Sequence, residues 1–170
     1  ICKITKDYIG TRVANAYLSG DISKLTPDEL ELYQKALPIV NEAKKRSTEI
    51  AKELYIHDVI CKKVDYRTPQ TNPSAYAALV NGETNCQGYS DTFYMLGRMA
   101  GLNVRRIGGK FGGEFHVWNT ITFNDGKTYC VDVTQDDWYY SDKKKNRYFF
   151  FNMPLEVVQS IYQYPWEAIN

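Results

Sequence analysis

The sequence lacks several features that would point directly to a function. Its 21 basic and 20 acidic side chains leave a net charge of +1, so electrostatics favours neither nucleic acid nor an anionic membrane as a partner. No apolar run approaches the roughly 18 residues of a membrane span, so none is predicted. The 4 cysteines show no Cys-x-x-Cys spacing, which argues against a structural zinc site. Histidine is scarce, with 2 in the chain.

The composition is that of a globular domain rich in aromatic side chains. The chain is 44% apolar and includes 14 tyrosines. Its 170 residues are enough to bury one hydrophobic core, so we predict a single domain over 1–170. The chain begins with Ile1 rather than Met, which indicates a trimmed domain, so the lack of a leader says nothing about location. A disulfide bond among Cys2, Cys61 and Cys130 stays open.

Helical periodicity dominates the first part of the chain. Thr26-Pro27-Asp28-Glu29 predicts a helix start, with a capping box and proline at the first helical position. Pro38 predicts a kink or break in that helix. A second helix is predicted from about residue 47 to 64, and its apolar stripe carries His57 and Cys61. On such a stripe both side chains are more typical of a packed core than of catalysis.

One cysteine lies where a helix is predicted to begin. A polar loop ending at Asn85 places Cys86 on the first turn, apolar residues recur at helical spacing to Ala100, and Gly101 supplies the stop. Cys86 falls on the inward stripe of this helix. A thiol at a helix N-terminus feels the positive end of the macrodipole, which favours the thiolate. The alternative is that Cys86 is a small buried apolar residue, as free cysteines usually are.

After Gly101 the hydrophobic period changes from 3.6 to 2. We predict a short C-terminal helix that begins at Pro154. We also predict a turn over 108–113 and strands over 104–109, 115–123, 128–133 and 148–151. Helices followed by antiparallel strands are typical of the α+β class.

The hairpin around Asn124-Asp125-Gly126 fixes a register with chemical consequences. If Gly126 takes the left-handed position of a three-residue loop, Trp118 lies opposite Asp132. His116 and Asp132 then share one face of the sheet as diagonal neighbours. A two-residue loop would place them on opposite faces. The glycine at the third loop position favours the register that keeps them together.

A thiol, an imidazole and a carboxylate are the groups that nucleophilic thiol catalysis requires. In this interpretation His116 takes the proton of Cys86 and later returns it to the leaving group, while Asp132 holds the imidazole tautomer. An ion pair between Cys86 and His116 would favour the thiolate further. Two alternatives stay open. The three side chains could form an unrelated polar patch, or they could ligate a metal.

Such a site also needs hydrogen-bond donors for an oxyanion. The backbone N–H of Cys86 is a natural donor, and Gln87, Tyr76 and Gln70 are candidate side-chain donors. For Gln87, pointing into solvent is an equally good interpretation. Trp118 is expected to shield the imidazole from water, which is compatible with packing in the sheet.

Three segments resemble the transglutaminase-like superfamily, most closely its bacterial members. They are Asn85-Cys86-Gln87-Gly88-Tyr89, His116-Val117-Trp118-Asn119, and Tyr129-Cys130-Val131-Asp132-Val133-Thr134 followed by Asp136-Asp137. The family pattern is Cys-x-Gly-Tyr, His-Ala-Trp-Asn and Asp-Val-Thr-Trp-Asp-Asp, in that order. The resemblance runs from about residue 57 to 151. The chain departs from it at Val117, where the family has Ala, and at Gln135, where it has Trp.

The resemblance implies a papain-like α+β core in which N-terminal helices precede an antiparallel sheet packed on the nucleophile helix. The core is expected over 46–153, after a helical extension over 1–45 and before a C-terminal helix or tail over 154–170. Cys86 would be the nucleophile, His116 the base and Asp132 the orienting carboxylate. The triad implies no metal and no organic cofactor. The bacterial resemblance favours a secreted or cell-surface location.

The implied reaction is acyl transfer from an amide of a peptide or protein substrate through a thioester. Water or an amine would resolve the thioester, and hydrolysis is favoured because no amine site is identifiable. The alternative is a catalytically inactive domain that binds a protein or a glycan. Its surface would be Trp138-Tyr139-Tyr140 together with Tyr148.

Overall fold

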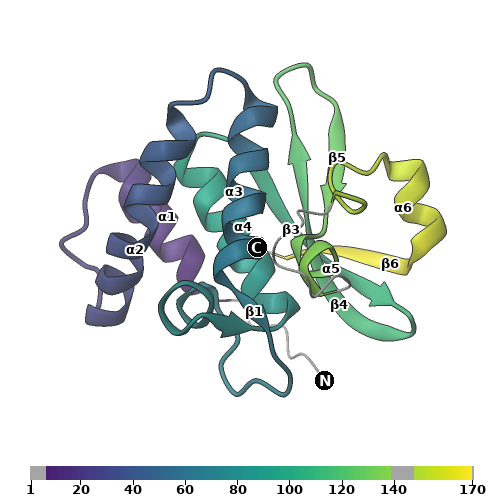
Figure 1. The fold of residues 1–170 in the computed structure, drawn as a ribbon, viewed down its shortest axis with the longest axis horizontal. Helices are drawn as coiled ribbons and strands as arrows, with labels where there is room; N and C mark the ends of the chain where they lie inside the picture. Colours follow the sequence, from purple (N-terminus) through teal and green to yellow (C-terminus); the bar gives the residue numbers. More distant parts are fainter. Residues whose placement is uncertain (1–6, 139–147, 170) are drawn as a thin grey trace.

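The computed structural model describes residues 7–138 and 148–169, and Figure 1 shows its two halves. One half gathers the helices α1 (Ile9–Ser19), α2 (Pro27–Lys44), α3 (Glu49–Lys63) and α4 (Cys86–Met99). The other half is an antiparallel sheet of order β5-β4-β3-β6, with β3 at Asn103–Phe111, β4 at Glu114–Thr122, β5 at Thr128–Val131 and β6 at Tyr162–Ile169. Helices α5 (Val133–Trp138) and α6 (Leu155–Ile161) adjoin the sheet. The predicted α+β class is confirmed.

Short elements join α3 to α4. Strands β1 (Asp65–Tyr66) and β2 (Glu83–Thr84) pair in parallel, and a π-helical turn, η1 (Ala77–Asn81), lies between them. No helix in the described part of the chain has both the length and the apolar character to cross a membrane.

Helix α2 begins as predicted but is not broken at its internal proline. Thr26 Oγ1 accepts from the Glu29 N–H at 3.4 Å, and the Glu29 carboxylate accepts from the Thr26 N–H at 2.9 Å, which completes the capping box. The helix continues through Pro38 to Lys44, so of the predicted kink or break the break is wrong, and the kink stays a prediction. The proline ring faces solvent, while Ala36 before it and Ile39 and Val40 after it are buried, so packing on both sides of Pro38 maintains the helix.

Helix α4 is the central element, and it begins at Cys86 as predicted. Asn85 is its N-cap, with the side-chain oxygen accepting from the Gln87 N–H at 3.0 Å. Helices α1, α2 and α3 pack around α4, and β3 and β4 pack against its remaining side. The helix ends at Met99, with Ala100 as its C-cap and Gly101 following at φ 89°, so the predicted stop is confirmed.

The β3–β4 hairpin is tighter than the predicted turn over 108–113. Only Gly112 and Gly113 form the turn, with φ values of 59° and 84°, the positive pair that a type I′ turn requires. Gly109 lies within β3, where a Cβ atom would be 2.8 Å from Trp118 and 3.0 Å from Trp166. The glycine is therefore needed for close packing of two indole rings rather than for a flexible loop.

The predicted register of the second hairpin is confirmed. Gly126 has φ 83°, and Asn119 pairs with Val131 as the three-residue loop requires. The strand ends at Val131, earlier than predicted, because Asp132 begins α5. Asp132 Oδ1 accepts from the Gln135 N–H at 3.1 Å, which is the geometry of a helix N-cap.

The C-terminal part differs from the prediction in one strand. Residues 148–151 form turns rather than a strand. A short helix does follow Pro154, but it leads into β6, which pairs antiparallel with β3 from Phe111–Tyr162 to Arg106–Ile169. The fourth strand of the sheet is therefore β6.

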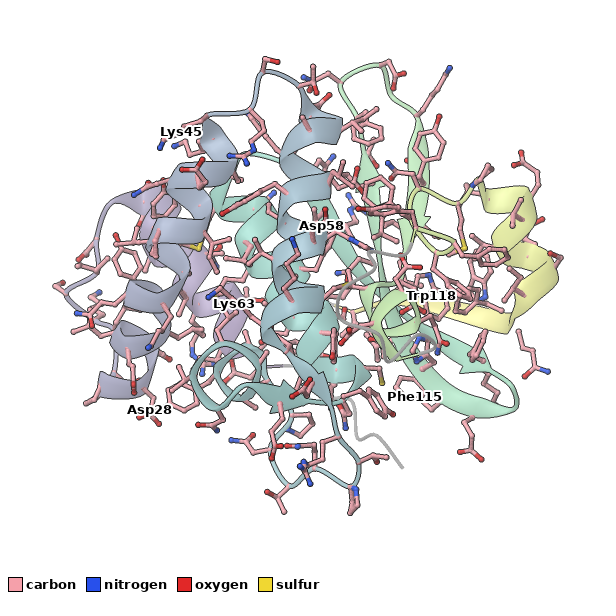
Figure 2. All side chains as sticks on the ribbon, in the orientation of Figure 1. Asp28, Lys45, Asp58, Lys63, Phe115 and Trp118 are labelled. Carbon is pink, nitrogen blue, oxygen red and sulfur yellow. The ribbon has the colours of Figure 1, made fainter. Side chains whose placement is uncertain are left out.

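Both faces of the sheet are packed. One face joins the main core between the sheet and the helices, where Ile121 and Val131 are buried. The other face carries a second cluster that includes Trp118, Cys130 and Tyr162 and extends to α6. Figure 2 shows Trp118 in the half of the molecule occupied by β6 and α6. Cys61, Cys86 and Cys130 are buried and form no disulfide bond among the described residues, and Cys2 lies outside those residues.

Candidate active site

The structure brings together the imidazole and the carboxylate predicted from the hairpin register. His116 of β4 has its Nε2 atom 2.6 Å from Asp132 Oδ2. Both side chains are nearly inaccessible, with relative exposures of 6% for His116 and 1% for Asp132. Because Nε2 is engaged by the carboxylate, Nδ1 is the ring nitrogen left to serve a reacting group.

Three donors converge on the Asp132 carboxylate. Oδ2 accepts from His116 and from the hydroxyl of Tyr162 at 2.6 Å, and Oδ1 accepts from the Gln135 N–H. Burial raises the pKa of Tyr162, and the nearby Asp132 charge raises it further, so this hydroxyl keeps its proton and donates it. No pattern in the sequence points to Tyr162. The N-cap role was visible in the sequence, because an Asp followed three residues later by Gln is a helix-start signal.

Aromatic rings enclose the imidazole. The Trp118 ring lies nearly parallel to that of His116, with centroids 6.0 Å apart and an interplanar angle of 16°. The Tyr162 ring is also nearly parallel to it, at 6.1 Å and 19°. Trp118 is 1% exposed, so it packs in the sheet and contacts the imidazole at the same time. This placement is compatible with its predicted role as a wall of the site.

Contacts between α4 and β4 align Cys86 with His116. Ser90 Oγ donates to the Trp118 carbonyl at 3.1 Å. Cys86 lies one helical turn before Ser90, about 6 Å along the axis, and His116 lies two residues before Trp118, about 6.6 Å along the strand.

The helix and the strand also run in the same direction. Gly97, near the C-terminal end of α4, lies against Val104, since a Cβ atom at Gly97 would be 2.7 Å from Val104 Cγ2. Val104 pairs with Ile121 near the C-terminal end of β4. These contacts set the first turn of α4 at the level of His116. Cys86 is 4% exposed at this point.

The candidate oxyanion donors have different positions. Gln87 is 1% exposed, so the alternative in which it points into solvent is wrong. The Tyr76 hydroxyl donates to Glu31 on α2 at 2.8 Å, so its proton is engaged there, and its role as an oxyanion donor stays a prediction. Gln70 stays a prediction.

His57 is a core histidine, as the apolar stripe predicted. It is fully buried, with Nε2 2.7 Å from Asp136 Oδ2 and Nδ1 3.0 Å from Asp58 Oδ1. Figure 2 labels Asp58 on α3. Burial opposes the charged imidazolium, but the bonds to Asp136 and Asp58 raise the pKa of His57 to about 9.

This core histidine supports the site through a chain of hydrogen bonds. Asp136 Oδ1 accepts from the Phe150 N–H at 2.9 Å, and the Phe150 carbonyl accepts from the Asp132 N–H at 2.9 Å. The backbone of Asp132 is thereby tied through Asp136 to His57 of α3. His57 therefore holds the segment that carries the Asp132 carboxylate in place without contacting it.

A buried ion pair anchors the other side of α4. Arg106 Nη2 lies 2.5 Å from Asp91 Oδ1, and both side chains are at most 1% exposed. Asp91 Oδ2 also accepts from the N–H groups of Gly10 at 3.2 Å and Ala75 at 3.0 Å. Asp91 therefore connects α4 to α1, to the segment before η1 and to β3.

Within residues 7–138 and 148–169, no group of three or more His, Cys, Asp and Glu side chains could hold a metal ion. Of the proposed aromatic binding surface, Tyr139, Tyr140 and the side chain of Trp138 lie outside the described residues.

A cysteine on the first turn of a central helix that packs on an antiparallel sheet, with a histidine of that sheet bonded to an aspartate just beyond its edge strand, is the arrangement of the papain-like class of folds. Comparison with known proteins gives the family. The model of the transglutaminase-like superfamily matches residues 36–142, and the chain belongs to that superfamily. No curated protein matches it.

Solved structures support the fold. A transglutaminase (TGase) crystal structure is similar with a TM-score of 0.56 at 17% identity, over 73% of this chain and 37% of that one. A candidate cysteine protease from Cytophaga hutchinsonii has a TM-score of 0.51 at 16% identity, over 88% of this chain and 55% of that one. This chain therefore spans about a third of the first relative and about half of the second.

Proposed function

We propose that this domain is a thiol-dependent acyl-transfer enzyme acting on amide bonds of peptides or proteins. Cys86 is the nucleophile, His116 the general base and then acid, and Asp132 the carboxylate that orients the imidazole. The observation that carries the proposal is the buried bond of 2.6 Å between His116 Nε2 and Asp132 Oδ2, on a strand aligned with the Cys86 turn of α4.

The chemistry follows from this arrangement. His116 Nδ1 accepts the Cys86 proton, and the thiolate sulfur attacks the amide carbonyl. The tetrahedral oxyanion is stabilised by the backbone N–H of Cys86 at the positive end of α4, with Gln87 as a candidate second donor. The imidazolium then protonates the departing amine, which leaves a thioester on Cys86. Attack by water, deprotonated by His116, releases the acid and restores the thiol.

Hydrolysis is the favoured outcome over transfer to an amine. No feature of the described residues identifies a binding site for an acceptor amine. The two similar structures carry both descriptions, since one is named a TGase and the other a candidate cysteine protease. The assay must therefore offer both water and a primary amine as acceptors of the acyl group.

The test begins with the thiol itself. The rate of Cys86 alkylation by iodoacetamide is measured against pH, with site-resolved mass spectrometry, in the wild type, Cys86→Ala and His116→Ala. Burial raises the pKa of Cys130 to about 11, so Cys130 is an internal control thiol that stays slow at neutral pH. We expect Cys86 to react well below pH 8.5, about the pKa of an ordinary thiol, and to lose this reactivity in His116→Ala.

Substrate assays follow on labelled casein, with and without an added primary amine carrying a fluorophore. Peptide release without amine incorporation supports hydrolysis, and incorporation supports transfer. A Cys86 that is inert, or that titrates as an ordinary thiol whether or not His116 is present, would refute the proposal. The protein- or glycan-binding interpretation would then be the one to pursue.

A further inference from the structure

Tyr162 lies against the same carboxylate oxygen that holds the imidazole. Its hydroxyl is 2.6 Å from Asp132 Oδ2, the atom that also accepts from His116 Nε2. Tyr162 is 1% exposed, and its ring packs on Trp118 with centroids 4.4 Å apart and on Phe111 at 5.2 Å. A ring held between two others has little freedom, so the direction of the hydroxyl is set by the fold.

The backbone fixes this position as well. Tyr162 is the first residue of β6, where it pairs with Phe111 of β3, and it directly follows α6. The carboxylate is fixed from its other side, because Asp132 is the N-cap of α5. Tyr162 also lies beyond residues 36–142, the segment that matches the family model. This contact therefore belongs to the part of the chain that the family model does not cover.

We propose that Tyr162 is a positioning residue of the Cys86–His116–Asp132 site, holding Oδ2 toward the imidazole and limiting the negative charge that the imidazole feels. The inference rests on the function proposed above. A hydroxyl that donates to Oδ2 draws electron density from that oxygen. The carboxylate then stabilises the imidazolium less than it would without this hydroxyl. The Cys86–His116 ion pair is therefore lost, as pH rises, at a lower pH.

Other titratable groups surround this pair and enter the design of the test. Cys86 is on the first turn of α4, Cys130 is on β5 beside Asp132, and Asp136 is on α5, where it is bonded to His57. From β3 the contact is Phe111, which does not titrate. Among the described residues, His116 and Tyr162 are the side chains that donate a hydrogen bond to Asp132. A substitution that removes only the Tyr162 hydroxyl therefore isolates its effect on the carboxylate.

The decisive variant is Tyr162→Phe, which keeps the ring contacts and removes the hydroxyl. We expect the alkaline limb of the pH profile of kcat/KM to move up by about 0.5–1 unit, and the acid limb of the Cys86 alkylation profile to move down, because an imidazole beside a more negative carboxylate takes the thiol proton at lower pH. We expect kcat to fall about 3- to 10-fold with KM within about 2-fold, magnitudes typical of losing one ordinary hydrogen bond. The matched control is Tyr89→Phe, which removes another buried tyrosine–aspartate hydrogen bond, the one to Asp137.

If Tyr162 had only a structural role, Tyr162→Phe and Tyr89→Phe would both lower stability. The pH profiles of both variants would then be the same as those of the wild type. Urea denaturation measures that stability. The NMR titration of the imidazole protons gives a second reading in the Cys86→Ala background, where 2 histidines make assignment simple. The midpoint of His116 should rise in Tyr162→Phe and not in Tyr89→Phe.

The outcomes separate the two proposals. A reactive, His116-dependent Cys86 whose profile is unchanged by Tyr162→Phe would overturn the role of Tyr162 alone. A shift of equal size in Tyr89→Phe would overturn it as well. An inert wild-type Cys86 would overturn the proposed function, and the role of Tyr162 with it.

Discussion

Replacing the buried Glu53 by glutamine should make the protein more stable at neutral pH. Glu53 is on α3 and is fully buried, and its Oε2 accepts from Asn152 Nδ2 at 2.9 Å. Its other oxygen, Oε1, and the Asn152 oxygen are both buried and lack a donor. Burial raises the pKa of Glu53 to about 8, although Asn152 and His57 act in the opposite direction. A neutral side chain that carries a donor suits this position better than a carboxylate.

The magnitude follows from the difference between the folded and unfolded states. The unfolded carboxyl loses its proton near pH 4.5 and the folded one near pH 8, so the native state holds the extra proton and its stability falls as pH rises between these values. At about 1.36 kcal/mol per unit, the full loss is about 5 kcal/mol above pH 8 and about 3 kcal/mol at pH 7. Glu53→Gln removes this loss, and imperfect amide geometry should leave about 1–3 kcal/mol of gain at pH 7.

Urea denaturation at pH 4, 7 and 9 tests this prediction. At pH 4 the free energy of unfolding of Glu53→Gln should equal that of the wild type or be lower by up to about 2 kcal/mol, the cost of the amide geometry. It should be higher in the variant at pH 7 and higher still at pH 9. Glu114→Gln, at an exposed glutamate of β4, is the control and should change stability little at any pH. A difference between Glu53→Gln and wild type that does not vary with pH would refute the reasoning.

Two further substitutions test the packing around α4. In Gly88→Ala the new Cβ would lie 2.0 Å from Thr84 Oγ1, so urea denaturation should show a loss of about 1–3 kcal/mol that Thr84→Ala partly restores; no loss would contradict the packing described. Asp91→Asn leaves Arg106 buried without its carboxylate and should cost about 3–5 kcal/mol, against less than about 1 kcal/mol for Asp7→Asn at an exposed ion pair. Equal losses in the two aspartate variants would be inconsistent with this ion pair.

The parts of the fold that were predictable depend on local signals. The start of α4 at Cys86 follows from the capping position of Asn85, and the register between Asn119 and Val131 follows from the left-handed glycine at 126. Loop geometry alone therefore placed His116 and Asp132 on one face, and the structure joins them at 2.6 Å.

The parts that were missed depend on contacts between distant segments. Strand β6 contains Pro165, and its pairing with β3 is set by burial of Trp118 and Tyr162 rather than by any pattern within residues 162–169. The turn at 148–151 is held by bonds from Phe150 to Asp132 and Asp136. The third donor to the carboxylate could not be found from sequence spacing, because 30 residues separate Tyr162 from Asp132.

The position of β6 bears on where this domain can be cut. A fragment that ended with the family-matched segment at residue 142 would lack β6 and expose the backbone N–H and C=O groups of β3 between Arg106 and Phe111. An unpaired strand of this kind is a template for edge-to-edge association with other chains. It would also uncover the Trp118 ring at Gly109, where no side chain protects the strand. For expression or for transplanting the domain, the boundary that keeps β3 paired on both sides lies at or beyond Ile169.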